Sequence, residues 1–143
     1  MSSRRKAREL ALQLLFQIDL TQSTPQEVVG LFWRVNETES KNRKYAEFLF
    51  LKAFENQAQI DELIVKHAQH WRLERMAVVD RNVLRMAVSE LLYGETPSIV
   101  VIDQALEIAR KFSTDESTQF VNGILDSVKD EIENQGLREG QHE

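Results

Sequence analysis

The sequence of 143 residues has no cysteine, and no apolar run in it approaches the length of a membrane-spanning helix. The missing cysteines exclude structural disulfides and thiolate-bound metals, which fits an intracellular protein. The opening Met-Ser-Ser-Arg-Arg-Lys leads into an amphipathic stretch rather than the continuous apolar region of a signal peptide. We therefore expect a cytoplasmic protein that is not bound to a membrane.

Proline and glycine are also scarce, with two and five residues respectively, and strand-like alternation is rare. Long helical periodicities fill the chain between them, at a length that suits one compact domain. We predict an all-α bundle of about seven helices, arranged as two subbundles that share one core within residues 1–134. The expected helices cover about residues 3–20, 24–35, 43–56, 59–70, 76–93, 98–112 and 113–134.

Local residues support several of these helix starts. Capping boxes begin at Thr24, where Pro25 follows in the first helical position, and at Ser113. The β-branched cluster at residues 98–102 is interpreted as a buried helix start, with a short strand as the alternative.

The boundary between the two subbundles is expected near residue 70, which gives subbundles of about 1–70 and 71–134. The helices at 43–56 and 59–70 are either continuous or kinked, and the sequence does not decide between these two forms. The polar, glycine-containing tail of residues 135–143 is expected to be disordered.

Charge is distributed unevenly along the chain. The net charge of −5 argues against a protein that coats nucleic acid non-specifically, yet four cations precede the first acidic residue. Such a cluster neutralises phosphates, and cations at a helix N-terminus oppose the macrodipole unless an anion is bound. Nucleic-acid binding and a solvated helix start both remain open for this cluster of Arg4, Arg5, Lys6 and Arg8.

Phe16 lies nearly opposite the apolar stripe of the first helix, on the side that carries Gln13. This arrangement suits single-stranded RNA, because guanidinium groups hold phosphate, a ring stacks on a base and an amide reads a base edge. The alternative is a central helix that is buried all round, in which Phe16 and Leu12 pack on the other subbundle. The stripe itself consists of Ala7, Leu10, Ala11, Leu14 and Ile18.

Phe120 lies at the flank of the apolar stripe of the last helix, with Gln119 and Asn122 as polar neighbours. Gly123 weakens the helix relative to alanine and lets another backbone or a ligand approach. Whether a helix or a ligand makes that contact is open.

The helix at 76–93 carries an uneven set of polar residues. Glu90 falls closer to the apolar side of this helix, and partner binding and an internal salt bridge explain it equally well. The remaining polar residues are predicted to face outward, and these are Asp80, Arg81, Arg85 and Ser89.

No motif in the sequence indicates catalysis. A glycine-rich phosphate loop, a cysteine nucleophile and a Gly-x-Ser-x-Gly turn are all missing. His67 and His70, beside Trp71, have no positioned third ligand and make a poor metal site. We expect no enzyme activity, no metal site and no cofactor.

Several segments together resemble the NusB family of transcription antitermination factors. They are SRRKARELALQ at 3–13, DRNVLRMAVSEL at 80–91, PSIVVIDQALEIA at 97–109, KF at 111–112 and FVNGILD at 120–126. The segments follow in the order of the family and cover nearly the whole chain, whereas residues 21–44 resemble it only in being helical.

The resemblance implies two perpendicular helical subbundles and a non-enzymatic adaptor. The adaptor is expected to bind the boxA element of nascent ribosomal RNA leaders in a heterodimer with NusE, a ribosomal protein, and to load onto elongating RNA polymerase and suppress termination. The expected partner surface comprises Asp80, Arg81, Arg85 and Glu90. The expected RNA-binding residues are Arg4, Arg5, Lys6, Arg8, Gln13, Phe16, Glu116, Phe120 and Asn122.

Two of these positions depart from part of the family. Phe16 stands where some relatives have tyrosine, so a hydroxyl contact is lost while stacking remains. Glu116 stands where some relatives have aspartate.

Two other functions remain as alternatives. A NusB-like domain also opens a family of RNA cytosine methyltransferases, but 143 residues leave no room for the catalytic domain. The second alternative is a purely protein-binding module or homodimer in which the arginines are merely solvated.

Overall fold

The computed structural model describes residues 3–69 and 72–139, and every regular element within these ranges is helical. The all-α prediction is therefore confirmed for the described chain, and none of the described helices is long and apolar enough to cross a bilayer. The elements are α1 (Ser3–Leu20), α2 (Pro25–Val35), α3 (Ser40–Glu55), α4 (Gln57–His67), the 3-10 helix η1 (Leu73–Arg75), α5 (Val78–Tyr93), α6 (Ser98–Phe112) and α7 (Asp115–Gln135).

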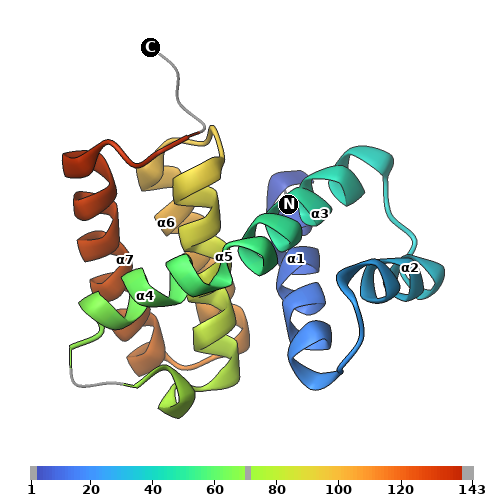
Figure 1. The fold of residues 1–143 in the computed structure, drawn as a ribbon, viewed down its shortest axis with the longest axis horizontal. Helices are drawn as coiled ribbons and strands as arrows, with labels where there is room; N and C mark the ends of the chain where they lie inside the picture. Colours follow the sequence, from blue (N-terminus) through green and yellow to red (C-terminus); the bar gives the residue numbers. More distant parts are fainter. Residues whose placement is uncertain (1–2, 70–71, 140–143) are drawn as a thin grey trace.

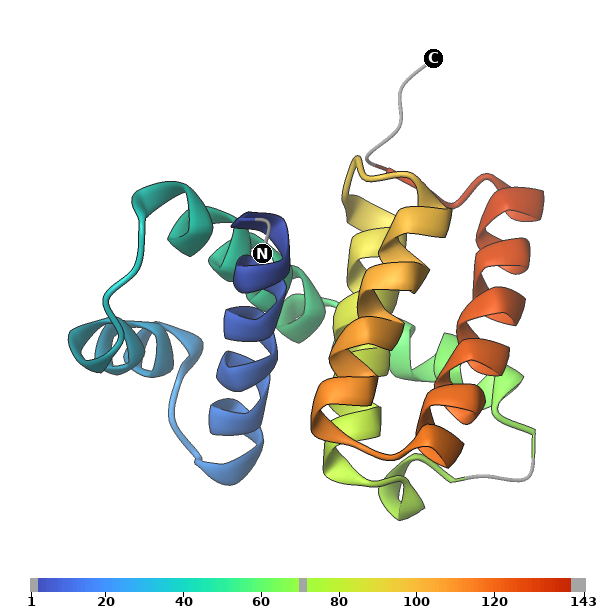
Figure 2. The ribbon, with the colours of Figure 1, turned by 180° about the vertical axis from the view of Figure 1, so that it is seen from behind.

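The helices form two groups that lie side by side (Figures 1 and 2). The first group contains α1, α2 and α3, and the second contains α4, α5, α6 and α7. We expected the division near residue 70, but α4 packs on α5 and α7, so the division falls at Asn56 between α3 and α4. Asn56 has φ −113° and ψ 22° and separates two distinct helices, which settles the question of continuity.

Side-chain caps set two of the helix starts. Thr24 accepts a hydrogen bond from the N–H of Glu27 at 3.2 Å, as the first capping box predicts. At α7 the cap is Thr114, which accepts from the N–H of Ser117 at 3.0 Å, one residue later than expected. The β-branched segment at 98–102 begins α6, so the strand alternative is wrong. The start is not buried as predicted, because Ile99 is 76% exposed and burial begins at Val101.

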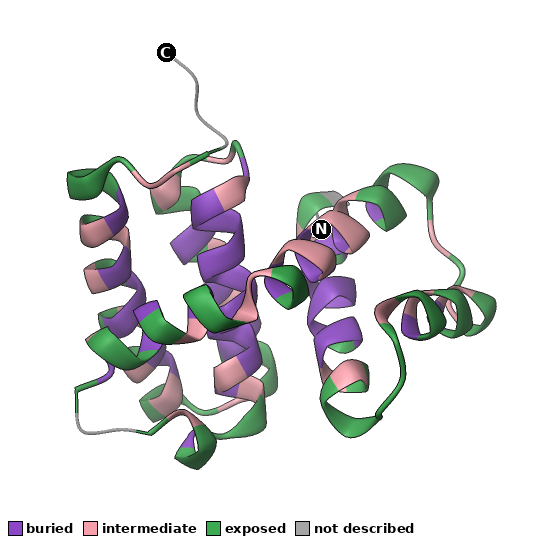
Figure 3. Ribbon diagram, in the orientation of Figure 1, coloured by how far each residue is buried: buried purple, intermediate pink, exposed green. Residues whose placement is uncertain are grey.

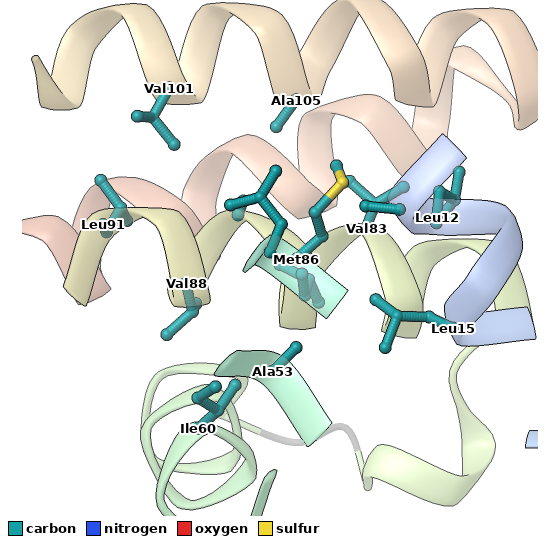
Figure 4. Packing of buried hydrophobic residues seen from close by; sticks show 14 of the residues in the cluster. Leu12, Leu15, Ala53, Ile60, Val83, Met86, Val88, Leu91, Val101 and Ala105 are labelled. Carbon is teal, nitrogen blue, oxygen red and sulfur yellow. The ribbon is translucent and has the colours of Figure 1, made fainter. Parts of the chain in front are cut away.

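The helix α5 runs through the middle of the molecule and contacts α1, α3, α4, α6 and α7. Its residues 82–92 are all buried, including the polar ones (Figure 3). In the interior, Leu12 of α1 lies beside Val83 of α5, while Val101 and Ala105 of α6 point toward α5 (Figure 4). Apolar side chains from both groups therefore share one cluster, and burial of their surface is the main force that holds the groups together.

The polar tail, for which we expect disorder over residues 135–143, makes contacts with the end of α5 within its described residues. Nε of Arg138 donates to the carbonyl oxygen of Gly94 at 3.0 Å, and the N–H of Glu139 donates to the carbonyl oxygen of Leu92 at 2.7 Å. The tail therefore closes over the end of α5, and the final four residues lie outside the described part of the chain.

Candidate nucleic-acid interface

The basic cluster at the start of α1 is divided by burial, and Arg8 is its inward member. Arg8 is 3% exposed, and its Nε and one terminal nitrogen each donate to a carboxylate oxygen of Glu90 at 2.8 Å. Burial lowers the pKa of Arg8, but the hydrogen bond and charge of Glu90 outweigh this effect and leave it raised. Arg8 thus ties α1 to α5, and its guanidinium is bound to Glu90 in the interior.

A tyrosine that the sequence analysis did not single out also binds Glu90. The hydroxyl of Tyr45, on α3, donates to the second carboxylate oxygen of Glu90. Burial and the negative charge of Glu90 raise the pKa of Tyr45 to about 12. We name Arg8, Tyr45 and Glu90 the junction triad, because it joins α1 and α3 of the first helix group to α5 of the second.

The other three cations remain at the surface or near it. Arg4 and Lys6 are exposed, and the guanidinium of Arg4 lies 3.6 Å from the ring centroid of Tyr45. Arg5 is half-buried and donates from Nε to the side-chain oxygen of Gln104 on α6 at 3.0 Å. The end of α1 therefore presents positive charge close to the junction triad.

Further along α1, the helix is buried at first and partly exposed beyond Leu12. Residues 7–12 are all buried, including Leu12, as in a central helix. Phe16 is half-buried and packs against the core, whereas Gln13 is exposed. Gln13 borders a hollow of about 600 Å³ between α1 and α2, the Gln13 hollow.

On α7, the structure brings Glu116 and Phe120 together. Both border a hollow of about 340 Å³, the Glu116 hollow, together with Arg75 and Asp80. A carboxylate beside an aromatic ring can accept from a base amino group while the ring stacks on a base. Asn122 is half-buried and does not border this hollow.

The residues of α5 that were expected to face outward are for the most part buried. Asp80 accepts from the hydroxyl of Ser113 at 3.0 Å, and Ser89 is 0% exposed. The outward assignment is wrong because it assumed one apolar face, whereas five helices surround α5. For Glu90, the two explanations were partner binding and an internal salt bridge, and the structure shows the salt bridge, which is to Arg8.

Two arginines of α5 make further ties to the surrounding helices. Arg85 forms two hydrogen bonds to Asp61 of α4, at 2.8 and 2.9 Å. Arg81 lies 3.4 Å from a carboxylate oxygen of Asp19 on α1, and its side chain is 18% exposed. Of the four expected partner residues, Arg81 alone is not buried.

An exposed aromatic side chain at the end of α6 was missed by sequence reasoning. Phe112, the last residue of α6, is 44% exposed, and Nζ of Lys111 lies 5.2 Å from its ring centroid. Lys111 also pairs with Glu9 of α1 at 3.0 Å. A signal was available in the adjacent lysine, since a basic residue beside a ring is typical of single-strand binding surfaces.

No group of three or more metal-ligating side chains occurs in the part of the chain that the structure describes. Nε2 of His67 lies 2.6 Å from a carboxylate oxygen of Glu131, which links α4 to α7. His70 and Trp71 lie outside the described residues.

Comparison with known proteins identifies the family. The model of the NusB family matches residues 5–130 of this chain. The chain belongs to the NusB family. A transcription antitermination protein NusB from Koribacter versatilis (strain Ellin345) is 50% identical over 133 residues, which cover 92% of this chain and 91% of the relative. Relatives of this kind are named as transcription antitermination proteins and not as enzymes.

Solved structures of the family have the same fold. T. maritima NusB superposes with a TM-score of 0.81 at 36% identity, covering 90% of this chain and 91% of that one. A structure described as antitermination factors NusB and NusE in complex with dsRNA has a TM-score of 0.81 at 27% identity, with 92% and 98% covered. The resemblance to NusB noted in the sequence is therefore confirmed.

Replacing Glu90 with alanine is expected to destabilise the fold by about 3–5 kcal/mol, because it leaves the buried charge of Arg8 uncompensated. The measurement is the free energy of unfolding in urea. Glu107→Ala is the matched control, since Glu107 pairs with Arg110 at 2.8 Å on the exposed face of α6 and its loss should cost less than about 1 kcal/mol.

The double variant Arg8→Met with Glu90→Met should recover part of this loss, since no buried charge is then left without a partner. Equal effects of Glu90→Ala and Glu107→Ala would contradict the structural role of the pair.

The raised pKa of Tyr45 predicts a specific loss of stability in alkali. Between about pH 10 and pH 12 the folded chain keeps the tyrosine proton while the unfolded chain loses it, so stability falls as pH rises. The unfolding free energy of the wild type should therefore fall more steeply over this range than that of Tyr45→Phe. Parallel pH profiles for the two proteins would show that Tyr45 titrates normally.

Proposed function

We propose that this chain binds the boxA element of nascent ribosomal RNA leaders together with NusE, and thereby suppresses premature transcription termination. Membership of the family supports the antitermination role. The relative solved with NusE and double-stranded RNA supports both partners. In this chain, the observation that carries the proposal is the exposed positive end of α1, together with the Glu116 hollow on α7.

Different residues contact the phosphates and the bases of the RNA. Arg4, Arg5 and Lys6 contact phosphates and position the strand, while base contacts specify its sequence. Gln13 and Asn122 offer amides for base edges, and Glu116 offers a carboxylate.

Rings supply the sequence-tolerant part of the binding. Phe16 and Phe120 are both half-buried, and a base stacks on the accessible part of such a ring. Arg8 acts indirectly in this proposal, because the junction triad fixes the end of α1 that carries Arg4, Arg5 and Lys6.

NusE approaches α5 through Arg81, since the other expected partner residues are buried within the chain. Asp80, Arg85 and Glu90 then hold the helix in place rather than contact the partner. We further propose that the RNA-bound pair joins elongating RNA polymerase in the cytoplasm. Two weak surfaces used together raise the effective affinity, as simultaneous engagement makes the second contact intramolecular.

Removing two exposed cations tests the RNA contact. The double variant Arg4→Ala with Lys6→Ala should bind boxA RNA more weakly, and the slope of log affinity against log salt should fall by about 1.4, since each phosphate contact on a single strand contributes about 0.7. Fluorescence anisotropy over a salt series, with and without NusE, is the measurement.

The matched control is Lys41→Ala with Lys44→Ala, which removes the same charge from exposed positions in the first two turns of α3. Equal slopes for the two double variants would contradict the phosphate contact. Equal wild-type affinity for boxA and scrambled RNA would contradict the proposed specificity, and no gain from NusE would contradict joint binding.

A further inference from the structure

Phe120 borders two hollows, and the proposed function uses the Glu116 hollow alone. The second has a volume of about 440 Å³ and lies between the end of α4 and the outer side of α7. We name it the Gly123 hollow. It is lined chiefly by His67, Gln69, Gln119, Phe120, Gly123 and Ser127.

The lining of the Gly123 hollow suits a flat molecule with hydrogen-bonding edges. Gln69 and Gln119 are exposed, and each amide carries two donors and an acceptor. Amides of this kind read base edges, and a phenyl ring beside them supplies a stacking surface.

The wall contributed by α4 is held in place. His67 pairs with Glu131 of α7 at 2.6 Å, and Lys66 pairs with the same carboxylate oxygen at 3.0 Å. The hydrogen bonds from His67 and Lys66 lower the pKa of Glu131, so this carboxylate stays charged at neutral pH. Gln69 follows with φ 52°, the one positive value among non-glycine residues of the described chain, and this left-handed turn ends α4 at the rim of the hollow.

Gly123 keeps the hollow open. Glycine within a helix is less favourable than alanine, yet a Cβ atom built at Gly123 meets nothing within 4 Å. Packing against a neighbouring helix therefore does not require glycine here, which leaves the approach of a ligand as the alternative. Gly30 of α2 also has nothing within 4 Å, but it borders the Gln13 hollow.

We propose that the Gly123 hollow receives one unpaired nucleobase of the bound RNA, next to the base in the Glu116 hollow. This inference rests on the proposed function and names a second base site for it. The base in the Glu116 hollow meets a carboxylate, whereas the base in the Gly123 hollow meets the amides of Gln69 and Gln119. The shared ring makes the two sites continuous along α7.

Filling the hollow tests the proposal without disturbing the fold. Gly123→Leu places a side chain in open space, so the circular dichroism spectrum and melting temperature should be retained. Its affinity for boxA RNA should fall about tenfold, as expected for the loss of one stacked base. Asn134→Leu is the control, since it adds a leucine at an exposed position of the same helix that borders none of the three hollows, and it should bind as the wild type does.

An RNA series with single abasic nucleotides locates the base. The wild type should lose affinity at two positions, one for each hollow, and one of these positions should become silent in Gly123→Leu. The double variant Gln69→Ala with Gln119→Ala should lose base preference at that same position, because the amides that read the edge are gone.

The outcomes separate the two proposals. A wild type that distinguishes boxA from scrambled RNA, while Gly123→Leu binds with wild-type affinity, overturns the base site alone. A wild type that binds both RNAs equally overturns the proposed function and the base site with it. An abasic profile that is unchanged in Gly123→Leu overturns the base site even if overall affinity falls.

Discussion

The junction triad is the constraint on which the arrangement of the two helix groups depends. Arg8 and Glu90 are both almost fully buried, and two charges in such a place are tolerated only when each satisfies the other. Tyr45 donates a further hydrogen bond to the same carboxylate. Apolar burial pulls the groups together without direction, whereas the triad accepts only one relative placement of α1, α3 and α5.

Neighbouring residues at the end of α5 and the start of α1 pack closely around the triad. A Cβ atom at Gly94 would lie 2.9 Å from the carbonyl oxygen of Glu90 and 3.0 Å from its Cγ, so glycine is needed where the chain leaves α5. Arg138 then holds the carbonyl oxygen of Gly94 from the tail. On the other side, Arg4 stacks on Tyr45, and the internal ion pair is thereby coupled to the cation that we assign to RNA.

Sequence reasoning captured the features that are local. The seven α-helices of the described residues, the Thr24 cap and the family all follow from periodicity, spacing and motif order. It failed where distant segments meet. Arg8 and Glu90 are 82 residues apart, and nothing near Arg8 marks it as different from Arg4. The burial of α5 also cannot be predicted from a single apolar face, because this helix has neighbours on all sides.

In the candidate site, too, local features are predictable from the sequence, whereas contacts between distant segments are not. Glu116 and Phe120 are four residues apart on one helix, so their meeting is predictable from spacing alone. The Gly123 hollow needs the end of α4 beside α7, a contact that no local pattern specifies. The order of the tail rests partly on main-chain carbonyl oxygens as acceptors, which carry no signal in the sequence.

The most direct test of the central claim is an NMR titration of the ¹⁵N-labelled protein with boxA RNA. If the fixed helix groups present one RNA surface, the backbone amides of Lys6 on α1 and Phe120 on α7 should shift together and saturate at the same RNA concentration. Shifts confined to one of these helices, or saturation at different concentrations, would contradict a single surface built from both groups.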